Sequence, residues 1–117
     1  MWIFLSDSFL SIVEYRPDPS KLLVRARIRG DIERVFPGVR AVHTPVRADY
    51  AYRASIDRKA VAVAVSKQVL DIDYPNFKDS VLEDDRHDAY MGVWTTMNNY
   101  QRQRALPLRR KIRFRPL

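Results

Sequence analysis

The sequence contains no cysteine and only three glycines in 117 residues. Without cysteine the chain has no disulfide framework, no disulfide-linked partner and no thiolate metal site, so it gains nothing from an oxidising compartment. The isolated Gly30, Gly38 and Gly92 cannot assemble a phosphate-cradling loop of the P-loop or dinucleotide-binding type. We therefore predict no cofactor, and we expect a binding protein in preference to an enzyme.

Long hydrophobic runs are also absent, since no stretch of about 18 apolar residues is available to cross a bilayer. The apolar residues 1–5 lack a preceding basic region and are soon followed by Asp7, which is not the pattern of a signal peptide. We expect a cytoplasmic protein that does not bind a membrane. A hydrophobic content of 46% over this length suits one small globular domain.

The net charge of +7 is distributed unevenly along the chain. Residues 1–70 carry twelve Lys/Arg and seven Asp/Glu, residues 71–101 carry two and seven, and residues 102–117 carry seven and none. The net charge of residues 1–101 is therefore zero, and the whole excess of +7 lies in residues 102–117. A basic run at a terminus is typical of an arm that binds a partner. We predict a single α+β domain over residues 1–101 and a basic C-terminal extension over residues 102–117.

The first half of the chain has the composition and periodicity of β-strands. Residues 2–5 and 8–15 are rich in β-branched and aromatic side chains, which predicts a hairpin. Residues 21–29 alternate between apolar and mostly basic side chains, as in a strand with one buried face. A single helical turn is predicted at residues 32–36, and a fourth strand at residues 50–56.

Two helices are predicted after these strands. Asp57 is suited to the N-cap of a helix over residues 57–72. One face of that helix would carry Val61, Val65, Val69 and Ile72, with Ala60 and Ala64 beside them. The valine-rich centre fits a buried strand as well, and the helix is preferred for its length and its cap. The Asp73-Tyr74-Pro75 triplet predicts the start of a second helix.

A third helix is predicted to begin at Asp84 and Asp85 and to dock on the sheet. Its mostly apolar stripe consists of His87, Tyr90, Met91, Trp94, Met97 and Gln101. Trp94 is expected to be the buried centre of this stripe. The predicted fold class is thus α+β, with an antiparallel sheet of three to four strands and two to three helices packed on one face.

Several short motifs occur in an order that resembles a known pattern. Residues 1–100 contain MWIF…FLSIV, then KLLVRARIRGDIERVFP, ADYAYRASI and DIDYPNFKDSV. The matching positions are Asp49, Tyr50, Tyr52, Arg53, Asp73, Tyr74, Asn76, Phe77, Lys78, His87 and Trp94. The pattern resembles a family of small uncharacterised proteins of bacteria and their phages. The resemblance implies a small α+β fold and no assigned activity, and it does not cover the tail from Arg102.

The candidates for catalysis are few. His43 and His87 are the only side chains that titrate near neutrality when unperturbed, so a metal-independent nuclease would use one or both of them. An acidic cluster offers oxygen ligands for a cation and consists of Asp79, Glu83, Asp84, Asp85, His87 and Asp88. Acidic residues are also expected at a helix start because of the helix dipole, so we predict no catalytic residue and no metal site.

The candidates for binding are arginines. Arg25, Arg27 and Arg29 occupy alternate positions of the predicted third strand and would share one face at a spacing close to 7 Å. Arg53 and the tyrosines of adjoining strands would add to a platform for single-stranded nucleic acid. The alternative is a solvated face that charge protects from aggregation. The tail adds five basic candidates, Arg109, Arg110, Lys111, Arg113 and Arg115, which alternate with apolar residues in part.

From these features we hypothesise a small binding or regulatory protein of phage or mobile-element origin that engages nucleic acid or a nucleoprotein complex. An anti-CRISPR-type inhibitor of a host defence complex is one concrete form of such a protein. The alternatives are a histidine-dependent nuclease and a structural module that pairs through its aromatic and acidic helix face. The sequence leaves the oligomeric state open.

Overall fold

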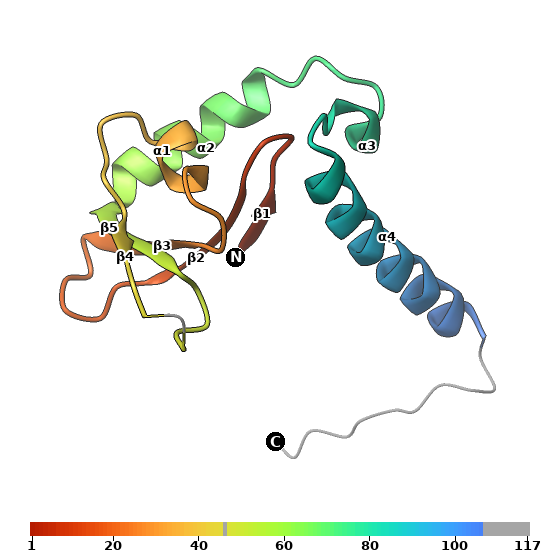
Figure 1. Cartoon of the computed structure of the whole chain (residues 1–117), viewed down its shortest axis with the longest axis horizontal. Coiled ribbons are helices and arrows are strands. Elements are labelled where there is room, and N and C mark those ends of the chain that lie inside the picture. Colours follow the sequence, from red (N-terminus) through yellow and green to blue (C-terminus); the bar gives the residue numbers. More distant parts are fainter. Residues whose placement is uncertain (46, 107–117) are drawn as a thin grey trace.

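An N-terminal hairpin starts one antiparallel sheet, to which later segments of the chain add strands. The computed structural model describes residues 1–45 and 47–106, and within them five strands and four helices form (Figure 1). The strands are β1 (Trp2–Phe4), β2 (Phe9–Glu14), β3 (Lys21–Ala26), β4 (Val42–His43) and β5 (Tyr52–Asp57). The helices are α1 (Asp31–Val35), α2 (Arg58–Leu70), α3 (Phe77–Ser80) and α4 (Asp84–Ala105).

The α+β class and the antiparallel sheet are confirmed, with one strand more than predicted. The strand order is β1-β2-β3-β5-β4, and every neighbouring pair is antiparallel. The additional strand is β4, which pairs with β5 at one edge of the sheet. Because β4 has two residues, it has no periodicity that a sequence pattern can show. No helix of the described part of the chain is long and apolar enough to cross a membrane.

The strand β3 is shorter than predicted, since it ends at Ala26 and not at Arg29. Ala26 is the last β3 residue with a partner, because β5 begins at Tyr52 opposite it. The chain then turns into α1 at Gly30, whose φ of 92° is left-handed and favours glycine. Arg27 and Arg29 therefore lie beyond the strand.

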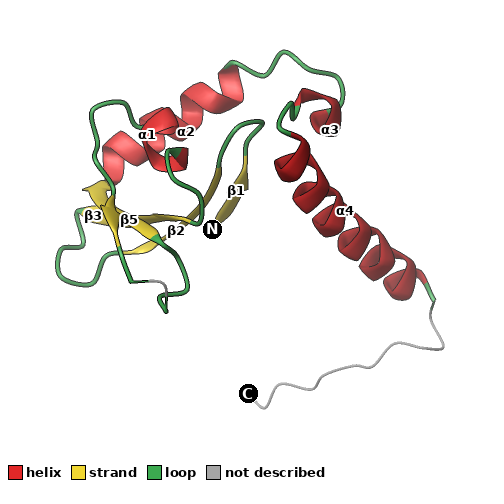
Figure 2. Ribbon diagram, viewed as in Figure 1, coloured by secondary structure: helices red, strands yellow, loops and turns green. Residues whose placement is uncertain are grey.

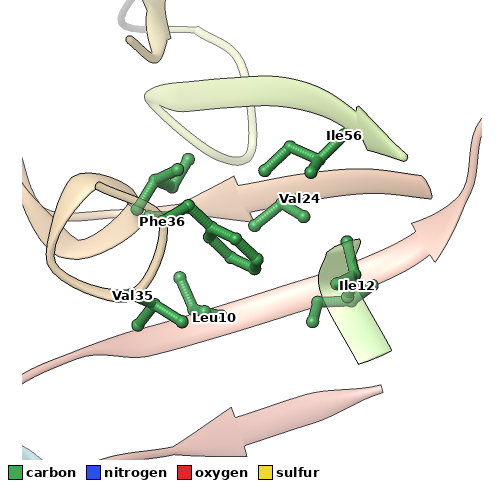
Figure 3. Close-up of a cluster of buried hydrophobic side chains, with 9 residues drawn as sticks. Leu10, Ile12, Val24, Val35, Phe36 and Ile56 are labelled. Atoms are coloured by element: carbon green, nitrogen blue, oxygen red, sulfur yellow. The ribbon is translucent and has the colours of Figure 1, made fainter. Parts of the chain in front are cut away.

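The core lies between the sheet and the helices α1 and α2. These helices pack against β2, β3 and β5 (Figure 2). Figure 3 shows part of the buried cluster, which consists of Leu10, Ile12, Val24, Ala26, Ile32, Val35, Phe36, Ile56 and Val61. Burial of a large aliphatic side chain contributes roughly 1.5–3 kcal/mol, so this small cluster is the main source of stability.

The segment after Asp57 is a helix, which decides between the two readings of its valine-rich sequence. Asp57 occupies the N-cap of α2, but its side chain makes no capping hydrogen bond. Val61 is buried, whereas Val69 and Ile72 are 61% and 52% exposed. The predicted apolar face is therefore covered only in the first half of α2. The next helix, α3, starts later than predicted, because the Asn76 side chain caps it by accepting a hydrogen bond from the Lys78 amide.

The helix α4 docks only by its first turns and then projects from the sheet (Figure 2). Its 22 residues span about 33 Å. The radius of gyration is 17.1 Å, against about 13 Å for a compact domain of this size. Trp94 and Met97 are 57% and 54% exposed, so the prediction that the whole stripe docks on the sheet is wrong. The helix also continues through the predicted domain boundary at residue 101.

The exposure of Trp94 leads to a first prediction. Trp94→Ala will change the free energy of unfolding by less than about 1 kcal/mol in dilute solution, because its side chain leaves no cavity. The matched core change Leu10→Ala removes a side chain with 0% exposure and will cost about 2–5 kcal/mol. Urea denaturation followed by circular dichroism measures both. A loss of several kcal/mol in the Trp94 variant would show that this side chain is buried.

Candidate nucleic-acid interface

The face of the sheet opposite α1 and α2 carries a row of side chains that runs across its strands. Alternation along each strand turns Leu10, Ile12 and Val24 toward the core, and the residues between them toward the opposite face. In the strand register Trp2 is the partner of Ser11, Ser11 of Arg25, and Arg25 of Arg53. We name these four residues the open-face row, although Ser11 within it is 1% exposed and accepts a hydrogen bond from Arg25. At about 4.8 Å per strand it is about 14 Å long.

Two arginines stand side by side at one end of the open-face row. Arg25 and Arg53 are cross-strand partners, and both are half-buried. The Nε atom of each is buried and has no hydrogen-bond partner in the described part of the chain. Like charges directly opposite one another destabilise a sheet, and an unsatisfied buried donor adds to that cost. Oxyanions that contact these two side chains from solvent would reduce the repulsion between the two charges.

Tyr50 positions Arg25 and its neighbour Arg27. The Cζ atoms of Arg25 and Arg27 lie 4.4 Å and 4.2 Å from the centroid of the Tyr50 ring. Tyr50 is 2% exposed but does not belong to the core cluster. Arg25 also donates from Nη2 to Ser11 Oγ at 2.8 Å, and Arg27 donates from Nη1 to the Asp49 carbonyl at 2.7 Å. Stacking on an aromatic face contributes about 0.5–2 kcal/mol and holds a flexible guanidinium in place.

Trp2 provides a flat aromatic surface at the other end of the open-face row. Its side chain is 67% exposed and contacts the Phe9 ring edge to face, with centroids 6.2 Å apart. Trp2, Phe9, Arg27 and Tyr50 line a groove of about 390 Å³, whose opposite wall is the start of α4. The groove is mostly apolar but is also lined by Asp31, Glu83 and Asp85. Its residue in contact with the arginine pair is Tyr50, on which Arg25 stacks.

A buried ion pair fixes the wall that α4 forms. Arg86 donates to Asp31 through Nη1 at 2.9 Å and Nη2 at 2.8 Å, and the two side chains are 6% and 0% exposed. The Phe9 amide also donates to the Asp31 carboxylate, at 3.0 Å. Burial alone would lower the pKa of Arg86, but hydrogen bonds to Asp31 and Tyr90 raise that pKa above its ordinary value. This guanidinium therefore remains charged, and its bidentate pairing sets the orientation of α4.

Tyr90 supplies a second anchor one turn later on α4. Its hydroxyl lies 3.0 Å from the carbonyl oxygens of both Leu5 and Ser8, and its one proton is shared between these two acceptors. Its ring packs against Phe4 with centroids 5.2 Å apart and stacks on Phe77 at 5.8 Å. Burial raises the pKa of the Tyr90 phenol, so it keeps its proton throughout the neutral range.

The other predicted binding residues are not all brought together. Arg29 lies with its Cζ 5.5 Å from the centroid of Tyr52, a side chain that packs against the core cluster. Arg29 therefore does not join the open-face row, and the prediction that Arg25, Arg27 and Arg29 share one strand face is wrong. The physical reason is the early end of β3. Arg109, Arg110, Lys111, Arg113 and Arg115 lie outside the described residues.

His43 lies on one edge strand of the sheet, and His87 lies on the helix that contacts the other edge strand. His43 lies on the edge strand β4, where its ring packs against Tyr52 at 5.2 Å. His87 lies on α4, which contacts the other edge strand through Tyr90 and Phe4. Four strand spacings of about 4.8 Å separate these edges, about 19 Å in all, so the fold does not place both imidazoles on one phosphate.

The acidic residues around the start of α4 stabilise the first turn of that helix. Asp84 and Asp85 lie in its first turn, and Glu83 accepts a hydrogen bond from Arg86 Nε at 3.3 Å. In the described ranges, no three His, Asp or Glu side chains are grouped closely enough to hold a metal ion.

Comparisons with protein-family models, with curated proteins and with solved structures find no match. The family resemblance stays a prediction, and the argument for function depends on the geometry of the site.

Proposed function

We propose that this protein binds single-stranded nucleic acid on the open face of its sheet. The observation that carries the proposal is the cross-strand pair Arg25 and Arg53, in which two like charges with unpartnered Nε atoms lie side by side. The phosphates of a nucleic-acid backbone supply negative charge and acceptor oxygens for both arginines. A nucleoprotein complex with an accessible single strand would present the same chemistry.

The aromatic end of the open-face row favours an unpaired strand over a duplex. A base stacks on an aromatic ring only when its own face is free, which is the case in single strands. Trp2 offers such a ring about 10 Å along the row from Arg25, at two strand spacings. A strand would thus follow the row, with a base on Trp2 and one backbone phosphate on each of Arg25 and Arg53.

The groove beside α4 adds a wall to this platform. Arg27 lies on its rim and is exposed, and besides its hydrogen bond to the Asp49 carbonyl it lies 3.5 Å from the Asp49 carboxylate. A third phosphate can compete with this exposed carboxylate, because surface ion pairs are worth about 1 kcal/mol or less. We therefore assign three phosphate-contacting arginines to the site, Arg25, Arg27 and Arg53.

The test is a pair of substitutions that changes the arginine pair and leaves the core intact. Arg25→Ser with Arg53→Ser will weaken binding to a single-stranded oligonucleotide by about tenfold or more, because two charge-assisted contacts are lost. The slope of log K against log salt will fall in magnitude by about 1.4, or about 0.7 per phosphate released. Fluorescence anisotropy of a labelled oligonucleotide measures both quantities.

The matched control removes the same charge elsewhere. Arg16 and Arg40 are exposed and lie in the connections after β2 and after α1, away from the open-face row. Arg16→Ser with Arg40→Ser will leave most of the affinity and slope unchanged. Equal losses in the two double variants would show that only net charge matters and that the arginine pair is not a site.

Trp2→Ala will reduce the preference for single strands over duplex and leave the salt slope unchanged.

A further inference from the structure

The groove between the sheet and α4 combines an aromatic wall with carboxylates, which is unfavourable for a phosphate. Trp2 and Phe9 line it on the sheet, and Glu83 and Asp85 line it at the start of α4. A backbone phosphate that entered the groove would meet these like charges, which opposes its entry. A nucleobase is uncharged and carries N–H groups from which a carboxylate accepts. A base is therefore the part of a bound strand that suits this groove.

The groove has the size and the position to hold one base. Its volume of about 390 Å³ is near the lower end of the range of about 300–1,000 Å³ for small-ligand pockets. Trp2 belongs both to the groove and to the open-face row, and Arg27 lies on the rim. The base that stacks on Trp2 can thus occupy the groove while its phosphates remain on the arginines.

The α4 wall contains a buried donor that the chain does not use. Arg86 lines the groove, and its side chain is 6% exposed. Of the five N–H groups of an arginine, four have acceptors here, in Asp31, Glu83 and Tyr90. The second N–H of Nη2 has no acceptor in the described part of the chain. Because an unsatisfied buried donor is costly, an acceptor atom on a ligand would be favourable at this position.

Glu83 places a carboxylate next to this donor. Its Oε1 accepts from Arg86 Nε at 3.3 Å, and its Oε2 accepts no hydrogen bond within residues 1–45 and 47–106. Glu83 is the N-cap residue of α4, but its side chain makes no capping hydrogen bond. Asp31 differs, because its carboxylate already accepts from Arg34 and Arg86. The groove thus offers a donor and an unoccupied carboxylate oxygen side by side.

Guanine is the base whose edge matches these two groups. Its Watson–Crick edge carries the acceptor O6 and then two neighbouring donors, N1–H and the N2 amino group. Adenine and cytosine place a bare ring nitrogen beside their one amino group. Uracil and thymine place a carbonyl oxygen on each side of their one N–H. A carboxylate opposite these acceptors would repel them, so it accepts two hydrogen bonds only from guanine.

We propose that the groove reads a guanine of the bound strand, with Glu83 accepting from N1–H and N2–H and Arg86 donating to O6. Trp2 provides the stacking surface for the same base. This inference rests on the proposed function, because the base reaches the groove as part of a strand whose phosphates lie on the open-face arginines. Single strands that contain guanine are then the preferred ligands of the site.

The first experiment compares short thymine strands that differ only in their central base, by fluorescence anisotropy. The strand with a central guanine will bind about tenfold more tightly than the all-thymine strand, as expected for one bidentate base contact. Central adenine or cytosine will bind within a few fold of thymine. Equal affinity for all four strands would overturn the guanine inference and leave the proposed function standing. Failure to bind any of these strands would overturn both.

Two analogues of guanine identify the edge that is read, without a change in the protein. Hypoxanthine lacks the N2 amino group and will bind several-fold more weakly than guanine, because Glu83 then accepts one hydrogen bond fewer. 7-Deazaguanine lacks N7, keeps the whole Watson–Crick edge and will bind as guanine does. Weaker binding of 7-deazaguanine without weaker binding of hypoxanthine would show that the opposite edge is read, and would overturn the proposal.

Glu83→Gln tests the reading residue. Its amide presents one acceptor and places N–H groups against the donors of guanine, so the preference for guanine over thymine will be lost. Affinity for the all-thymine strand will stay within a few fold of that of the unchanged chain. Asp84→Asn is the matched control, because it removes the same charge at the next position and Asp84 does not line the groove. A Glu83→Gln chain that keeps the tenfold preference would overturn the proposal, as would an equal loss in the Asp84→Asn chain.

Discussion

Replacement of Arg86 by Met will lower the free energy of unfolding by about 3–5 kcal/mol, because it leaves the Asp31 carboxylate buried without its main partner. Asp31 is 0% exposed, and its carboxylate accepts hydrogen bonds from both terminal nitrogens of Arg86. A methionine fills most of the volume of the arginine stem, so the loss reports the charge and not a cavity. Urea denaturation of both proteins at neutral pH measures the difference.

Arg34→Met is the matched control. Arg34 donates to the same carboxylate at 2.8 Å, but its side chain is 42% exposed. Its replacement will cost less than about 1 kcal/mol, as for most exposed ion pairs. Asp31→Leu combined with Arg86→Met will recover a large part of the stability, since no buried charge then remains. If Arg86→Met and Arg34→Met unfold at the same urea concentration, the buried pair is not the anchor of α4.

The same ion pair connects stability to the candidate site. Asp31 follows the turn that ends β3, and Arg86 lies in the first turns of α4, 55 residues later. Together with Tyr90 they hold α4 beside Trp2 and Phe9, which forms the groove. Arg86→Met is therefore also expected to loosen this wall, while the arginine pair on the sheet stays in place.

The strands of the sheet were predictable because the pattern that indicates each strand lies within its own residues. The period-two alternation of residues 21–26 and the β-rich composition of residues 2–4 and 9–14 directly indicate strands. The end of β3 was not predictable, because the alternation of basic and apolar residues continues to Arg29. What ends the strand is the loss of its partner at Tyr52, which depends on the register with β5.

The apolar stripe of α4 shows a second limit of sequence patterns. Spacing indicates which side chains share one side of a helix, but not what covers that side. Tyr90 is covered by Phe4 and Phe77 of its own chain, whereas Trp94, one turn later, is mostly exposed. The prediction of a buried Trp94 was wrong for this reason.

The candidate site was predictable only in part. Arg25 and Arg53 could be selected by their residue type and their strands, but their pairing across the sheet requires the register. Nothing in the sequence indicated that Tyr50 positions arginines or that Trp2 is exposed. The ion pair of Asp31 and Arg86 was also missed. Its one signal is that Arg86 is the single arginine in the acidic stretch of residues 71–101.

Salt dependence is the second large effect that we expect. Three phosphate contacts by Arg25, Arg27 and Arg53 give a slope of about −2 in log K against log salt for single strands. This slope corresponds to a loss of affinity of about twentyfold between 50 and 200 mM salt. The five basic residues between 109 and 115 would steepen the slope to between about −5 and −6 if all of them contact phosphates.

Truncation after Leu106 separates these two contributions. It removes the basic tail and none of the residues that the structure describes, so the sheet and its arginine pair remain. The truncated chain is expected to keep the slope of about −2 and the preference for single strands, because both depend on the open-face row. Complete loss of binding on truncation would assign the activity to the tail alone.

The most direct test of the central claim is therefore the salt titration of the truncated chain against single-stranded and duplex oligonucleotides of equal length, followed by fluorescence anisotropy. The account predicts saturable binding that is tighter for the single strand and falls with salt at a slope of about −2. Failure to bind any single-stranded DNA or RNA at 50 mM salt, or equal affinity for single strand and duplex, would contradict the proposed function.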